Sequence, residues 1–439
     1  MLDPSRFAIA VEHLVAPLRR ELAGREFSDV LDEEGRQYVD LVLEGGGMLG
    51  VALVGYTYVL EQVGIRFLSL GGTSAGAINA LLLAALDTRD KAKTDDMVRL
   101  LANQNFYEFI DGDADARRVI GSALRGSGLL SMLYAGVQVR DNLEDHWGLN
   151  PGTVFYEWLR THLHAAGIHT WADLRTRLEA GSLVRRTGER YELPPAEKLL
   201  AIVAAEITTE TKVVFPRMAP LFWEEPEQVH PAEYARASMS IPFFYHPVRI
   251  RPPHDMGSAR RWIELASFDG PPPEECLLVD GGVLSNFPID IFHAPHRVPA
   301  APTFGAKLGV DRSYAHPVQS PLGLARAMFN TARHGLDYDF IIRNPDYRAL
   351  VTSISTQGFN WLDFAMPDED KLALFTRGAE AASSFLRLFD WAKYKELRRH
   401  LSHVHGAPDQ APAVRANGRV TSRAAPSAAR AAGRGRAAS

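Results

Sequence analysis

The stretch Ile65-Arg66-Phe67-Leu68-Ser69-Leu70-Gly71-Gly72-Thr73-Ser74-Ala75-Gly76 decides the fold of this chain. Its first six residues are mostly apolar and predict a buried strand, and the apolar run Ala77–Leu86 that follows predicts a buried helix. Ser74 therefore stands in a Gly-x-Ser-x-Gly turn between a strand and a helix. Such a turn exposes the serine hydroxyl at the start of the helix, and Gly72 and Gly76 leave room for it. This arrangement is typical of a nucleophile and indicates acyl transfer, although the five-residue pattern also occurs by chance.

The same alternation extends to both sides of this stretch. Upstream, residues 39–44 predict a strand that ends in glycines, and residues 50–63 have the pattern of a helix. Strands alternating with helices predict a parallel sheet covered by helices, the α/β class. Further strands are expected at residues 198–205, 212–215 and 277–280, and an amphipathic helix is expected at residues 383–401.

Composition divides the chain of 439 residues into three parts. Residues 1–38 are expected to form a helical extension, because apolar residues recur at helical spacing from Pro4 to Ala23. Residues 39–403 form the main domain, in which residues 88–190 are a mostly helical insertion that can act as a lid. Residues 404–439 are expected to be a disordered basic tail, since small residues and six arginines cannot form a core.

Charge and apolar content exclude several classes of protein. The net charge of −5 argues against general nucleic-acid binding, and the single cysteine, Cys276, excludes an internal disulfide. No apolar segment follows a basic start, so no secretory signal is expected. The longest apolar run, Ala77–Leu86, has about half the ~20 residues that a membrane span needs. A cytoplasmic protein is expected, with association at a membrane surface left open and the oligomeric state not predicted.

A second motif, Glu44-Gly45-Gly46-Gly47-Met48-Leu49-Gly50, joins the upstream strand to its helix. Glycine-rich turns at helix starts bind phosphates, but this one matches neither the dinucleotide-binding pattern nor a P-loop. Its backbone amides can instead converge on the oxyanion that forms when an ester carbonyl is attacked.

The third motif is Asp280-Gly281-Gly282, which ends a predicted core strand. An aspartate at the carboxyl end of a strand is well placed to face a site on an α/β sheet. Asp-Gly-Gly also favours an ordinary turn, so both interpretations stand for this motif alone.

The ordered set of three motifs resembles the patatin-like phospholipase family over residues 39–290, and more loosely to about residue 390. The resemblance implies a three-layer α/β/α fold with a mostly parallel central sheet. It also implies a lipid or acyl-ester hydrolase, either phospholipase A-like, lysophospholipase-like or a carboxylesterase, that works through a Ser–Asp dyad with no metal or cofactor. It makes Ser74 the nucleophile and Asp280 the base, and the oxyanion loop comprises Gly45, Gly46, Gly47 and Met48. The supporting motif residues are Gly50, Gly72, Gly76, Gly281, Gly282 and Asn286.

The chain departs from the family pattern at Leu49, where an arginine or lysine is usual. The proposed donors are backbone amides, so this difference bears on how the loop is held or on contact with a lipid head group. It leaves the choice between a phospholipid and another acyl ester open.

Two other functions remain open at this point. The first is an α/β-hydrolase with a Ser–Asp–His triad, for which the histidines after Asp280 are candidates: His293, His296, His316 and His334. The second is a non-catalytic lipid-binding or interaction module that keeps a hydrolase fold. The aromatic clusters Phe222-Trp223 and Phe243-Phe244-Tyr245 can line an acyl pocket, but core packing is the more ordinary interpretation.

Overall fold

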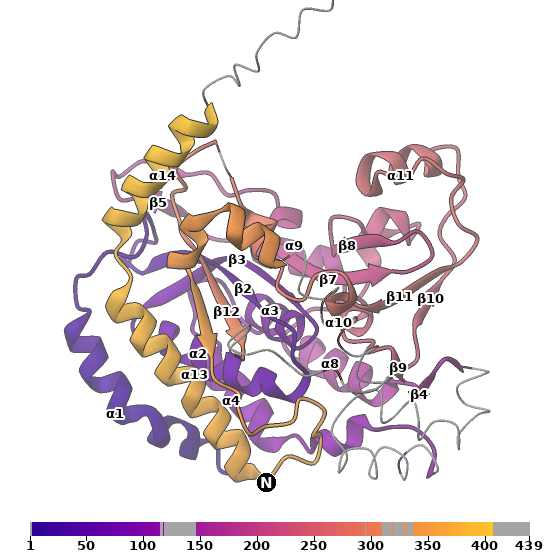
Figure 1. Ribbon diagram of the computed structural model, residues 1–439, viewed down its shortest axis with the longest axis horizontal. Helices are drawn as coiled ribbons and strands as arrows, with labels where there is room; N and C mark the ends of the chain where they lie inside the picture. Colours follow the sequence, from indigo (N-terminus) through magenta and orange to yellow (C-terminus); the bar gives the residue numbers. More distant parts are fainter. Residues whose placement is uncertain are drawn as a thin grey trace, which may run out of the picture.

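Strand β2 (Gln37–Leu43), helix α2 (Val51–Gln62), strand β3 (Ile65–Thr73) and helix α3 (Ala75–Ala85) follow one another as the sequence predicts (Figure 1). The structure is a computed structural model. It describes residues 2–114, 146–294, 296–309 and 337–406, and the isolated residues 117, 318, 327 and 331.

Five strands of the main sheet run parallel to one another, in the order β13 (Val351–Ile354), β12 (Thr303–Leu308), β2, β3 and β7 (Leu200–Glu206). The remaining strands of this sheet pair antiparallel. Strand β1 (Val30–Leu31) pairs with the start of β2, and β5 (Leu183–Arg185) and β6 (Arg190–Tyr191) follow beyond β1. Strands β8 (Thr211–Phe215) and β11 (Cys276–Asp280) both pair with β7, and β10 (Val248–Ile250) pairs with β11. A separate short sheet pairs β4 (Gly148–Asn150) with β9 (Phe243–Tyr245).

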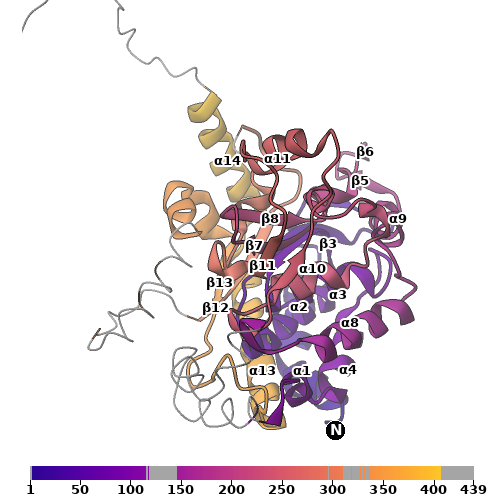
Figure 2. The same ribbon diagram turned by 90° about the vertical axis from the view of Figure 1, so that its right-hand side faces the viewer.

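Both faces of the sheet are covered. Neighbouring residues of a strand face opposite sides, and in β3 a Cβ on Gly71 would meet Phe292 whereas one on Gly72 would meet α3. Helix α13 (Asp368–Leu388) packs along α2, and α1 (Ser5–Glu21) packs on α13 (Figures 1 and 2). The expected α/β fold, with a central sheet of mostly parallel strands between helices, is confirmed.

The described part of residues 88–190 contains helices α4 (Thr94–Asn103), α8 (Thr153–Ala165) and α9 (Trp171–Glu179). It also contributes β5, which pairs with β1 and so extends the main sheet. Helix α10 (Ala232–Ser238) packs on β7, and α11 (Ser258–Ala266) projects at the upper right of Figure 1. The short 3₁₀ turns are η1 (Gly47–Gly50), η2 (Phe106–Phe109), η4 (Ala196–Lys198), η5 (Ala219–Leu221), η6 (Pro226–Gln228), η7 (Gly281–Val283), η8 (Ile289–Phe292) and η9 (Pro345–Ala349).

The single helix predicted over residues 383–401 is wrong. Helix α13 ends at Leu388, and a separate helix α14 (Trp391–Gly406) begins two residues after Phe389, whose backbone is extended at ψ 129°. The Asp390 carboxylate accepts a hydrogen bond from the Lys393 amide (3.0 Å) and so caps the start of α14. The periodicity of apolar residues continues across this break, and for that reason the sequence pattern did not show it. The predicted tail lies outside the described residues from 407 onward.

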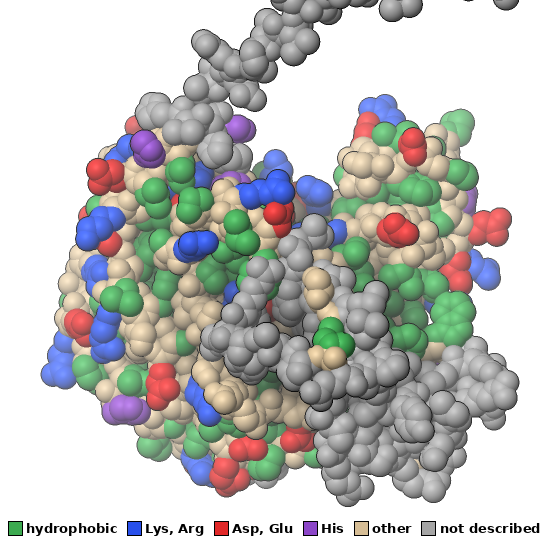
Figure 3. Space-filling view, in the orientation of Figure 1, with side chains coloured by type: hydrophobic (Ala, Val, Ile, Leu, Met, Phe, Trp, Pro, Cys, Tyr) green, Lys and Arg blue, Asp and Glu red, His purple; other side chains and the backbone are tan. Residues whose placement is uncertain are grey.

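Charged side chains of both signs are interspersed over the face shown in Figure 3. None of the helices in the described part of the chain is long and apolar enough to cross a membrane.

Candidate active site

Ser74 occupies a strained turn between β3 and α3. Its backbone has φ 53° and ψ −119°, a left-handed conformation that costs a non-glycine residue on the order of 1–3 kcal/mol. The side chain is buried, with 4% of its surface exposed. The Ser74 amide donates to the Ser238 hydroxyl (2.9 Å), and that hydroxyl donates to the Val203 carbonyl of β7 (2.6 Å). These bonds hold the turn in its strained shape.

The two glycines of the turn are required by close backbone approach. A Cβ on Gly72 would lie 2.4 Å from the carbonyl carbon of Gly76, and one on Gly76 would lie 2.1 Å from the Leu43 carbonyl oxygen. No side chain fits at either position without moving the backbone. The glycine spacing of the motif is therefore explained by packing of the strand against the helix.

The glycine loop after β2 passes directly beside Ser74. A Cβ on Gly45 would lie 3.1 Å from the Ser74 Cβ, and Gly47 and Met48 line the same cavity as Ser74. The Gly45 amide donates to the Asn286 carbonyl (3.0 Å) and the Met48 amide donates to the Trp361 carbonyl (2.9 Å). Within the described residues no hydrogen bond is found from the amides of Gly46 and Gly47.

Asp280 ends β11 two strands away from Ser74. It pairs with Ala204 of β7, and the neighbouring Val203 pairs with Thr73, the residue before Ser74. Its side chain is buried, with 8% exposed, and accepts a hydrogen bond from the Gly282 amide (2.7 Å). The structure thus brings all three predicted motifs to one edge of the sheet.

The segment after Asp280 connects the motifs to one another. Asn286 is buried, and its side-chain amide donates to the Glu44 carboxylate and to the Gly45 carbonyl, each at 3.1 Å. The Ser285 carbonyl accepts a hydrogen bond from the Thr73 hydroxyl (2.9 Å). The glycine loop and the serine turn are therefore fastened to the same short segment, and Asn286 has a structural role that its place in the motif did not reveal.

Two residues that the sequence did not predict support this segment. Asp337 accepts hydrogen bonds from the Ser285 hydroxyl (2.9 Å) and the Phe287 amide (2.8 Å), and burial raises the pKa of its carboxyl group. Lys307, on β12, forms a buried ion pair with Glu44 (3.2 Å). Both residues lie far along the chain from their partners and stand in no recognisable motif, so no local pattern signalled them.

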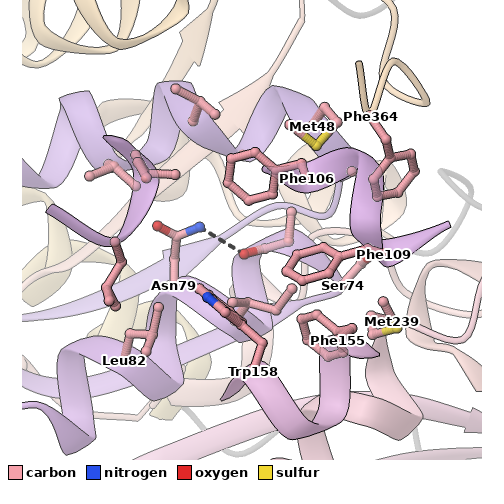
Figure 4. A pocket seen from close by; sticks show the side chains of 18 of the residues that line it. Met48, Ser74, Asn79, Leu82, Phe106, Phe109, Phe155, Trp158, Met239 and Phe364 are labelled. Atoms are coloured by element: carbon pink, nitrogen blue, oxygen red, sulfur yellow. Dashed lines mark hydrogen bonds between the residues drawn. The ribbon is translucent and has the colours of Figure 1, made fainter. Parts of the chain in front are cut away.

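An apolar cavity of about 790 Å³, including its opening, extends from Ser74 between α3 and the helices of the insertion (Figure 4). Aromatic side chains from η2 and α8 form much of one wall. The lining residues that matter for the argument below are Ser74, Ile78, Asn79, Leu82, Phe155 and Trp158.

The aromatic clusters noted in the sequence divide between core and cavity. Phe222 is buried in the core, where its ring packs against Phe215 and Trp262. Tyr245 lines the cavity. The wall aromatics Phe106, Phe109, Phe155 and Trp158 were missed, although both pairs have the i, i+3 spacing of residues on one helical face.

Among the described residues, no histidine lines this cavity, so the described histidines after Asp280 lie elsewhere. His293 Nδ1 lies 3.1 Å from the Tyr347 hydroxyl, and His296 is exposed. His316 and His334 lie outside the described residues. In the same part of the chain, no group of three or more His, Cys, Asp or Glu residues is arranged to hold a metal ion.

The chain also shows similarity to known proteins. The model of the family described as patatin-like phospholipase matches residues 41–293. The uncharacterized protein YqhO of Bacillus subtilis (strain 168) is 27% identical over 357 residues, which cover 80% of this chain and 98% of that protein. Among solved structures, VipD from Legionella pneumophila aligns with a TM-score of 0.39 and 16% identity, over 83% of this chain and 70% of that one. The family match spans more than half of the sequence and contains all three motifs, and the chain therefore belongs to the patatin-like phospholipase family.

Proposed function

We propose that the protein is a lipid acyl hydrolase that cleaves acyl esters with a Ser74–Asp280 dyad and a covalent acyl-enzyme. Membership of the family implies lipid acyl hydrolysis in general. The observation that carries the specific proposal is the position of Ser74. Its strained turn opens into the apolar cavity and stands beside the glycine loop that contains Gly46 and Gly47.

In the first half of the reaction, Asp280 accepts the proton of the Ser74 hydroxyl as Oγ forms a bond to the ester carbonyl carbon. The carbonyl oxygen becomes an oxyanion. We assign its stabilisation to the amides of Gly46 and Gly47, because those of Gly45 and Met48 already donate to other carbonyls. The carbon–oxygen bond to the alcohol then breaks, and the alcohol leaves with the proton from Asp280.

In the second half, Asp280 accepts a proton from a water molecule as that water attacks the acyl carbon. Ser74 Oγ leaves and regains the proton, and the fatty acid is released. An ordinary aspartate has a pKa of about 3.9 and is a weak base for a hydroxyl. The positive end of the α3 dipole at Ser74 and the oxyanion donors are therefore essential parts of the proposed mechanism.

The cavity accounts for an acyl substrate. Its apolar walls bury a hydrocarbon chain, at roughly 25 cal/mol for each Å² removed from water. Part of the wall belongs to α4 and α8 of the insertion, which supports a role for this region as a lid. We expect this lid to open at a lipid–water interface and the protein to associate with membrane surfaces. Turnover would then be faster on micelles than on the same ester as a monomer. Equal rates in the two forms would count against the lid.

The central experiment combines labelling with substitution. Purified protein is treated with a fluorophosphonate, and hydrolysis is measured on phospholipid, lysophospholipid, triacylglycerol and short-chain esters. We expect labelling at Ser74 and loss of both labelling and hydrolysis in Ser74→Ala. A folded wild-type protein that fails to label would favour the lipid-binding module.

The dyad is separated from a triad by two further variants. Asp280→Asn is expected to lower kcat by several orders of magnitude. His293→Gln is expected to retain activity, because the His293 ring is hydrogen-bonded to the Tyr347 hydroxyl. Full activity in Asp280→Asn, with any of the four histidines essential, would contradict the dyad.

A further inference from the structure

Besides Ser74, the wall of the largely apolar cavity contains a buried amide side chain. Asn79 lies on α3 five residues after Ser74, lines the cavity and is 6% exposed. Its side-chain nitrogen donates to the Ala75 carbonyl (2.8 Å). Its side-chain oxygen, Oδ1, is buried and has no hydrogen-bond partner among the described residues.

The orientation of this amide is fixed by its neighbour. The Ala75 carbonyl can only accept, so the atom of Asn79 that faces it must be the NH₂ group. The acceptor oxygen then points away from that bond, as Figure 4 shows. The cavity wall thus contains a buried acceptor for which the described residues supply no donor.

The place of Asn79 along the cavity is set by the helix. Ile78 and Leu82 on α3 and Ser74 at its N-cap recur at four-residue spacing, so they lie on one side of the helix. All three residues line the cavity. An acyl chain attached to Ser74 that follows this face passes Asn79 before it reaches Leu82 (Figure 4). At 1.5 Å per residue, Asn79 lies about 7 Å along the axis from Ser74, beside the part of the chain nearer the ester.

Oδ1 is already buried without a donor among the described residues, and an unsubstituted chain in this position would leave it so. A buried polar atom without a partner costs about 1–3 kcal/mol, and a hydroxyl on the chain removes that cost by donating to it. A leucine would fill the same wall without the penalty. Asparagine is also the poorer helix former, so local folding does not explain its presence.

We propose that the preferred acyl group of this enzyme carries a hydroxyl on the ester-proximal part of its chain, and that this hydroxyl donates to Asn79 Oδ1. Asn79 is then a specificity-determining residue, while the apolar walls beyond it bind the unsubstituted end. The proposal rests on acyl hydrolysis at Ser74.

The experiment compares matched esters of one chain length: unsubstituted, hydroxylated at proximal carbons (positions 3 to 6, each made separately), and hydroxylated at the terminal carbon. For the wild-type protein we expect kcat/KM for the best proximal hydroxy ester to exceed that of the unsubstituted ester about 10-fold. The terminal hydroxy ester is expected to be the poorest of the series, because its hydroxyl enters the apolar end.

Asn79→Leu tests the residue itself. We expect the ratio of kcat/KM for the proximal hydroxy ester to kcat/KM for the unsubstituted ester to fall to one or below. Leu82→Ala is the matched control on the same face of α3, and it is expected to change activity without removing the preference for the hydroxyl. Thermal unfolding of each variant establishes that it is folded, and Asn79→Ala replaces Asn79→Leu if the larger side chain prevents folding.

A binding measurement separates failure of this proposal from failure of the proposed function. Ser74→Ala protein is titrated with a hydroxy fatty acid and with its unsubstituted counterpart, by the change in tryptophan fluorescence. We expect tighter binding of the hydroxy acid, and loss of the difference when Asn79→Leu is added. Equal values for the two chains in both kinetics and binding would overturn the role of Asn79, even if Ser74 is confirmed as the nucleophile. If no ester is hydrolysed, the binding comparison alone decides.

Discussion

The two sides of Ser74 are built in opposite ways. On one side, the glycine loop, the serine turn and the segment after Asp280 are joined by directional hydrogen bonds among buried polar groups, among them Asn286 and Asp337. On the other side, the cavity is walled mostly by apolar side chains, among which Asn79 places a buried amide. Directional bonds fix atoms in one geometry, whereas apolar contacts tolerate changes of shape. The polar side therefore suits positioning of the reacting groups, and the apolar side suits selection of the chain.

The largest effect is expected where the polar side is broken at a buried charge. Glu44→Leu removes the buried carboxylate that forms an ion pair with the Lys307 ammonium and also accepts a hydrogen bond from Asn286. We expect the free energy of unfolding to fall by about 3–5 kcal/mol, measured by urea denaturation. The double variant Glu44→Leu/Lys307→Met is the control, and it should recover part of the loss. If the double variant loses as much free energy of unfolding as the two single variants lose together, the two side chains are not coupled.

Asp337→Asn tests the support beneath the catalytic segment. The amide that replaces the carboxylate can accept with one atom only, so either the Ser285 hydroxyl or the Phe287 amide loses its acceptor. We expect a loss of about 1–3 kcal/mol in stability. We also expect a fall in kcat with KM little changed, because Asp337 is a positioning residue that does not line the cavity. A change in KM alone would contradict this role.

Leu82→Phe tests the apolar side. The larger ring is expected to shorten the cavity beyond Asn79, so kcat/KM should fall about 10-fold for long acyl chains and change little for short ones. One tenfold step corresponds to roughly 1.4 kcal/mol, comparable to the burial of one or two methylene groups. Rates on a series of esters of increasing chain length measure the effect. A uniform loss at every length would indicate damage to the catalytic side instead.

The smallest effect is expected at an ion pair remote from both sides. Arg260 and Glu264 form a bridge of 2.6 Å on α11, with side chains 81% and 53% exposed. Glu264→Gln is expected to change stability by less than about 0.5 kcal/mol and activity not at all, because exposed pairs are screened by solvent. A measurable change in kcat would mean that α11 is energetically coupled to the active site.

The residues that could be predicted from the sequence are those in local patterns. The strand–turn–helix around Ser74 and the alternation that precedes it gave the α/β class, because apolar periodicity reports on burial directly. The three motifs were placed together by their order. The boundary between α13 and α14 was missed, since a capping aspartate at Asp390 leaves the periodicity intact.

The support of the site could not be predicted in the same way. Lys307 and Asp337 contact the motifs through long-range pairing of strands and segments, and single charged residues carry no signal of their own. Asn79 is a similar case. In sequence it is one polar residue in a helix, and only the cavity beside it shows that its oxygen lacks a donor.

The hydrogen bond from the Met48 amide to the Trp361 carbonyl joins the glycine loop to a segment well beyond the region that the family model matches. Strand β12, which carries Lys307, also lies beyond that region. A protein cut after residue 293 would keep every signature motif and lose the parts that hold one of them in shape. For this chain, the region that the family model matches is smaller than the unit that must fold for the motifs to act together.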